Sequence, residues 1–154
     1  MTAIDASESF TEFAQDVEPR LRYALTAALG QELGHEAAAE ALAYGWEHWD
    51  RVKDLSNPAG YLYRVGRRSV RFRSHNVAFD PVDSSRIPEV EPHLPEAMER
   101  LSERQRVSVF LAYGMGWTRS EVGELLGISA NSVGAHISRG LAKLRSGLGV
   151  SVDD

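Results

Sequence analysis

Apolar residues in the first half of the chain recur at steps of three and four, which is the period of an amphipathic α-helix. The first run predicts a helix that Gly30 ends. A second run is rich in alanine, the best helix former, and a third begins at Pro58, which suits the first turn of a helix capped by Ser56 or Asn57. The predicted buried stripes are Phe10, Phe13, Val17, Leu21, Ala24 and Leu25; Ala38, Ala41, Leu42, Trp46 and Trp49; and Tyr61, Leu62, Val65 and Phe72.

Residues 76–95 follow no apolar period and contain four of the six prolines, so they predict a flexible linker. Beyond it, Leu94, Ala97, Met98 and Leu101 indicate a short helix, and Ser102 with Gln105 forms a capping box before a longer one. No window alternates apolar and polar residues as a strand requires. We therefore predict an all-α fold of two small helical domains joined by a flexible linker.

Residues 117–145 combine two short helical patterns with a tight turn. Thr118 and Glu121 form a second capping box, Gly127 suits the left-handed backbone that ends a helix, and Ser129 can cap the next helix. Ile128 lies where a side chain fills the corner between two helices that cross steeply. This arrangement is typical of a helix-turn-helix, although an ordinary helical hairpin shares the geometry.

The second helix of this pair has two distinct faces. Val133, Ile137, Leu141 and Leu144 repeat at helical steps and predict a buried side, whereas Ser132, His136, Arg139 and Lys143 repeat on another side, with Asn131 near the helix start. Short hydrogen-bonding groups followed by cations are what a helix needs to read base edges and hold phosphates in the major groove of DNA. A solvated basic face is the other interpretation of the pattern.

Charge changes sign along the chain. The net charge is −5, which by itself disfavours a nucleic-acid partner, because phosphate binding requires clustered cations. Residues 58–75, however, contain five arginines and no acidic residue, and residues 104–146 contain six basic and two acidic residues. The first basic segment interleaves its arginines with aromatics that stack on unpaired bases, a pattern that a solvated helix with core aromatics also gives. Its candidate residues are Tyr61, Arg64, Arg67, Arg68, Arg71 and Arg73.

Several function classes find no support in the residues. The chain has no cysteine, its histidines are scattered, and no nucleophile elbow or glycine-rich phosphate loop occurs. We expect no enzyme activity, no cofactor and no metal site. No apolar stretch is long enough to cross a membrane and no export signal is recognisable, so we expect a soluble, cytoplasmic protein without membrane insertion.

The segment LSERQRVSVFLAYGMGWTRSEVGELLGISANSVGAHISRGLAKLR resembles region 4 of bacterial RNA polymerase sigma factors of the small, extracytoplasmic-function type. FTEFAQDVEPRLRYALTAALG, HEAAAEALAYGWEHWDRV and NPAGYLYRVGRRSVRF are similar to successive parts of region 2. The resemblance implies a region 2 domain at 8–75, a linker at 76–93 and a region 4 domain at 94–149. It departs from the family at Glu36, Ala39, Arg68 and Phe72, where Asp, Gln, Asn and Asp are usual.

The resemblance also implies partners and residue roles. Region 2 is expected to dock on the clamp helices of the largest subunit of core RNA polymerase through Glu36, Glu40, Tyr44, Trp46 and Arg51, and to capture the -10 element of promoter DNA near residues 64–73. Region 4 is expected to contact the flap of the second-largest subunit and to read the -35 element through Asn131, Ser132, His136, Arg139 and Lys143. An anti-sigma factor is a further partner that the family allows.

A second hypothesis stays open at this point. A stand-alone helix-turn-helix regulator, with N-terminal helices that sense a ligand or form a dimer, carries a similar C-terminal motif. Such a regulator binds a palindromic operator tightly without polymerase, whereas the sigma-factor hypothesis predicts weak binding of DNA until core polymerase is added.

Overall fold

The computed structural model describes residues 2–70 and 93–149, and every regular element in these two ranges is helical. The predicted all-α class is therefore confirmed. Most of the predicted linker, together with Arg71, Phe72 and Arg73, lies outside the described residues. The elements are α1 (Ala3–Leu29), α2 (Gln31–Glu47), α3 (Trp49–Val52), α4 (Pro58–Val70), α5 (Leu94–Glu99), α6 (Glu103–Val109), the π-helical turn η2 (Phe110–Gly114), α7 (Arg119–Leu126) and α8 (Ala130–Gly147).

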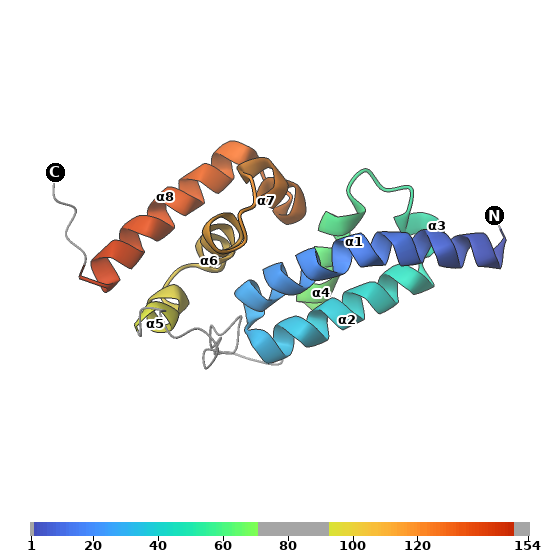
Figure 1. The fold of residues 1–154 in the computed structure, drawn as a ribbon, viewed down its shortest axis with the longest axis horizontal. Helices are drawn as coiled ribbons and strands as arrows, with labels where there is room; N and C mark the ends of the chain where they lie inside the picture. Colours follow the sequence, from blue (N-terminus) through green and yellow to red (C-terminus); the bar gives the residue numbers. More distant parts are fainter. Residues whose placement is uncertain (1, 71–92, 150–154) are drawn as a thin grey trace.

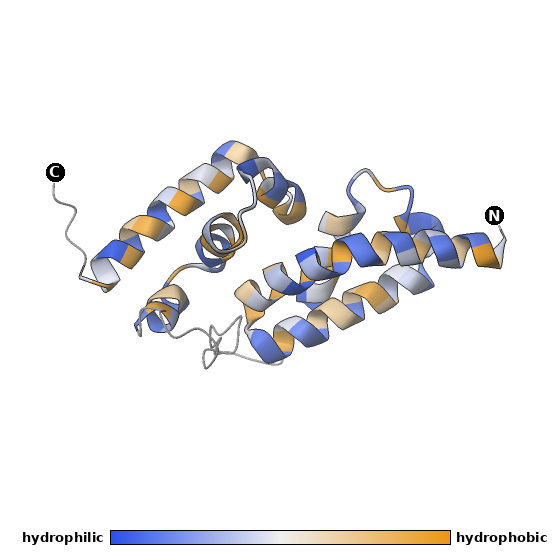
Figure 2. Cartoon of the chain, in the orientation of Figure 1, coloured by the Kyte–Doolittle hydropathy of each residue, from blue (hydrophilic) through white to orange (hydrophobic). Residues whose placement is uncertain are grey.

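Helices α1 and α2 lie side by side and form one half of the molecule with α3 and α4 (Figure 1). Gly30 ends α1 at φ 90°, as predicted, and Asn57 caps α4 by accepting a hydrogen bond from the backbone N–H of Gly60 at 3.0 Å. Hydrophobic and hydrophilic residues alternate along α1 and α8, as expected of helices that are buried on one side only (Figure 2).

The predicted stripe on the second helix is partly wrong. Trp46 is 48% exposed, and α2 ends at Glu47, so Trp49 belongs to the separate helix α3 rather than to the end of α2. The break at His48 turns the chain, and this turn buries Trp49 against the ring of Phe13, with 5.0 Å between ring centroids. Residues 49–52 form this short helix, which the sequence pattern did not separate from the second predicted run.

The buried side of α4 is also displaced from the prediction. Tyr63 is 4% exposed and Val70 is 1% exposed, whereas Tyr61 and Val65 are only half-buried. The reason is that α4 packs against α1, α2 and α7, so three neighbouring helices rather than one decide which of its residues are covered.

The C-terminal half follows the predicted local signals closely. Both capping boxes form, with Ser102 accepting from the N–H of Gln105 and Thr118 from the N–H of Glu121. Gly127 adopts the predicted left-handed conformation at φ 71°. The structure adds the π-helical turn, which α6 enters at Phe110 and which the apolar pattern did not indicate.

The two halves share one continuous core and several polar contacts. The side chain of Arg106 is 5% exposed and donates to the backbone oxygens of Ala27 and Ala28, at 2.6 and 2.8 Å, near the C-terminus of α1. Burial lowers the pKa of Arg106, although the carbonyl oxygens around it suit a guanidinium cation. Asn57 of α4 also donates to the backbone oxygen of Glu124 in α7.

Candidate nucleic-acid interface

The faces of α8 are those that the sequence predicted. Val133, Ile137 and Leu144 are buried and Leu141 is half-buried against the core. Asn131, Ser132, Arg139 and Lys143 are exposed and His136 is half-buried. The candidate residues for reading DNA therefore share an accessible side of one helix.

The turn before α8 fixes how this helix crosses α7. Gly127 supplies the positive φ, and Gly123 lets the chain return closely, since a Cβ at that position would lie 2.5 Å from the backbone oxygen of Ile128. Ser129 then caps α8 by accepting from the N–H of Ser132 at 3.1 Å, and its hydroxyl lies 2.9 Å from that of Ser132. These two contacts stabilise the first turn of α8 at its exposed end.

His136 lies in a locally cationic environment. Partial burial lowers its pKa from 6.5, and the nearby charges of Arg104 and Arg139 lower it further. The ring is therefore neutral at pH 7 in the free chain and can act as a hydrogen-bond donor and acceptor.

Two exposed arginines that the sequence prediction missed also lie beside α8. Arg104, from α6, is near enough to His136 to affect its pKa. The guanidinium of Arg119, the first residue of α7, lies against Gly134 of α8. Neither arginine is on the helix whose period was analysed, and only a tertiary contact brings them to it.

The structure divides the candidate residues on α4. Arg64 and Arg68 are exposed, whereas Arg67 forms an ion pair with Glu103 of α6 at 2.7 Å, and its Nε is buried without a hydrogen-bond partner among the described residues. Tyr61 is half-buried with its hydroxyl 3.2 Å from that of Tyr44. Arg71 and Arg73 lie outside the described residues.

The candidate polymerase-docking residues do not form a single cluster. Arg51 of α3 donates to the hydroxyl of Tyr44 on α2 at 2.6 Å. Tyr44 lies on the side of α2 that faces α4, where its hydroxyl is 3.2 Å from that of Tyr61. Trp46 lies on the α1 side, with its ring centroid 5.4 Å from that of Phe10. Glu40 and Glu36 are half-buried about one and two turns before Tyr44 on α2.

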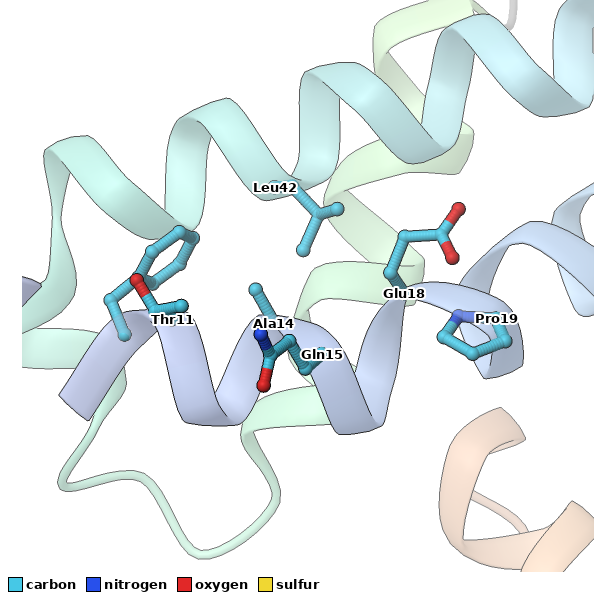
Figure 3. Close-up of a pocket in the computed structure, with 7 residues that line it drawn as sticks. Thr11, Ala14, Gln15, Glu18, Pro19 and Leu42 are labelled. Carbon is cyan, nitrogen blue, oxygen red and sulfur yellow. The ribbon is translucent and has the colours of Figure 1, made fainter. Parts of the chain in front are cut away.

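An open groove of about 420 Å³ runs between α1 and α2. Figure 3 shows Leu42 of α2 pointing toward Ala14 of α1, with Glu18 and Pro19 at one end. Two polar side chains that line the groove are hydrogen-bonded within α1. The hydroxyl of Thr11 donates to the backbone oxygen of Ser7, and the carboxylate of Glu18 accepts from Arg22. Across the described ranges, no three His, Asp or Glu side chains gather as a metal site would require, and no helix is long and apolar enough to span a bilayer.

Comparisons with known proteins agree with this geometry. Residues 94–144 match the family described as "Sigma-70, region 4", a range that includes α5 to α7 and all but the last three residues of α8. No curated protein sequence matches the chain. Among solved structures, the sigma factor RpoE from Bartonella quintana, determined in complex with the anti-sigma factor NepR, has 17% sequence identity and a TM-score of 0.59. The match covers 94% of this chain and 99% of that one, so the fold extends over both halves.

Proposed function

We propose that this chain, a member of the sigma-70 family through its region 4 domain at residues 94–144, is a sigma factor of the small, extracytoplasmic-function type that directs RNA polymerase to promoters. The observation that carries the proposal is the exposed polar side of α8 within a match to region 4. The sigma-70 family is not a class of enzymes, and no catalytic activity is proposed.

Region 4 is proposed to read the -35 element with α8. Asn131 and Ser132 are near the capped start of the helix, where short side chains reach base edges, and Arg139 and Lys143 follow where phosphates are contacted. Gly127 and Ser129 support this role because the turn and the cap that they form set the direction in which α8 leaves α7.

Region 2, at residues 8–75, is proposed to serve two partners. Arg64 and Arg68 are exposed on α4 and suit the phosphates of the -10 element, while Arg67 must leave Glu103 before it contacts DNA. Tyr44, Arg51 and the exposed Trp46 are proposed to contact the polymerase clamp helices. Because Trp46 and Tyr44 lie on opposite flanks of α2, docking would have to cover the helix from both sides.

An anti-sigma factor is proposed as a further partner. The solved sigma factor with this fold was determined in complex with one. Such an inhibitor would act in the cytoplasm, where promoter DNA and polymerase are found, by covering residues of the proposed docking surface.

The decisive experiment is reconstituted transcription. The purified chain added to core RNA polymerase is expected to start RNA at particular promoters that core polymerase ignores. Arg139→Ala should reduce the yield at all of these promoters, since it removes a phosphate contact, whereas Arg22→Ala removes an arginine that Glu18 already pairs on α1 and should leave the yield unchanged. Tight binding to a palindromic operator without polymerase, and no promoter-specific RNA, would instead favour the stand-alone regulator.

A further inference from the structure

Arg119 belongs to α7, but its guanidinium lies against α8, the helix that is proposed to read the -35 element. A Cβ built on Gly134 would lie 2.9 Å from Nη1 of Arg119 and 3.2 Å from its Cζ. The guanidinium therefore occupies the space into which a side chain at position 134 would project. Gly134 has no side chain to fill that space, so the cation of α7 takes its place on the surface of α8.

Arg119 has the properties of a free cation. Its side chain is exposed, and no carboxylate within residues 2–70 and 93–149 forms an ion pair with it. The nearby Glu121 is occupied at the cap of α7, where it accepts from the N–H of Thr118 at 3.2 Å. A guanidinium held against a helix without a carboxylate partner is available to an anion from solution.

The position of Arg119 relative to α8 indicates which anion its guanidinium binds. Val133 and Ile137 face the core and Asn131 and Arg139 face outward. Gly134 lies between these two sides, and its contact with Arg119 places it on the flank of α8 toward α7. When α8 lies in the major groove, the flank toward the first helix of the pair faces the sugar-phosphate backbone. Arg104 and His136 occupy the opposite flank, toward α6.

We infer that Arg119 binds a DNA phosphate at the edge of the -35 element, and that Gly134 is required because it makes room for the guanidinium on α8. This inference rests on the proposed function. It adds a DNA-binding residue that comes from α7 rather than from α8. Arg119 contributes affinity without sequence preference, because a phosphate is the same beside every base pair.

The test uses the full-length chain at low salt with two probes, a -35 promoter duplex and a random-sequence duplex of the same length. Arg119→Ala is expected to lower affinity for both duplexes by about tenfold and to reduce the slope of log affinity against log salt by about one. Arg22→Ala, which also removes one arginine, should change neither. Loss confined to the -35 duplex would overturn the phosphate assignment in favour of base reading.

Gly134→Ala tests the contact itself. The new methyl group would collide with the flexible end of Arg119 rather than with backbone, and alanine favours a helix more than glycine does, so the melting temperature should not fall while the guanidinium moves away. Affinity for both duplexes should fall in the natural background and stay unchanged when alanine already replaces Arg119. If the two substitutions act additively, Gly134 does not position Arg119.

Arg139→Ala in the same assay separates the two levels of the proposal. If Arg139→Ala weakens binding and Arg119→Ala does not, the inference about Arg119 fails while the proposed function stands. If neither substitution weakens binding, the DNA surface on α8 fails, and the proposed function fails with it.

Discussion

At the scale of single residues, the candidate site owes its chemistry to local environments. His136 illustrates this, because its ring is half-buried between two arginines of different helices and its pKa is lowered from 6.5. Arg106 is the opposite case, a cation that is nearly enclosed yet hydrogen-bonded to carbonyl oxygens at 2.6 and 2.8 Å. The type of residue alone does not distinguish these two roles.

If α8 binds DNA as proposed, His136 is expected to make that binding dependent on pH. Partial burial, Arg104 and Arg139 keep the ring neutral in the free chain, whereas DNA phosphates favour the protonated ring, so binding takes up a proton. Affinity for the -35 duplex should therefore rise as the pH falls below 6.5. Fluorescence anisotropy across this range should show a weaker dependence for His136→Gln, and an identical dependence in both chains would rule out the protonation of His136.

At the scale of elements, the helices are specified by their own ends and faces. Ser129 caps α8, Gly127 ends α7, and the buried residues of α8 repeat at helical steps. Pro19 shows the limit of such signals, since α1 continues through it to Leu29. Element boundaries therefore follow from local residues where a cap or a positive φ is present, and not from proline alone.

Ile137→Asp tests the assignment of the faces of α8. Ile137 is 4% exposed, and an unpaired carboxylate there costs several kcal/mol, which is on the order of the stability of a small domain. Circular dichroism during urea unfolding should show that residues 94–149 have lost their cooperative transition. Ser138→Asp, at the exposed neighbouring position, should keep it. A variant with Asp at 137 that unfolds like the natural chain would contradict the predicted buried side.

At the scale of the whole molecule, the two halves hold each other through contacts between residues distant in sequence. Arg106 bonds to the end of α1, the ring of Trp117 lies 5.6 Å from the guanidinium carbon of Arg20, and Arg67 pairs with Glu103. The third contact engages a residue proposed to bind the -10 element. The arrangement of the halves therefore limits how much of α4 is available to DNA.

Releasing Arg67 should strengthen the binding of single-stranded -10 DNA. In Glu103→Gln the ion pair is lost, and because such partly exposed pairs are worth less than about 1 kcal/mol, affinity should rise by at most about fivefold. Anisotropy of a labelled oligonucleotide measures the change. Glu96→Gln removes an equal charge from the exposed side of α5 and serves as the control, and equal gains in both variants would show a general charge effect.

The sequence by itself determined the helical class, the caps at Ser102, Thr118 and Ser129, the turn at Gly127 and the two faces of α8. These features depend on residues within a turn or two of each other, so helical period and capping chemistry are enough to specify them. Only the tertiary structure decided that Trp46 is exposed and Tyr63 buried, because burial depends on which helix packs alongside. The same holds for the contacts of Arg106 with Ala27, 79 residues away, and of Arg119 with Gly134, since nothing local in the sequence records which distant residues meet.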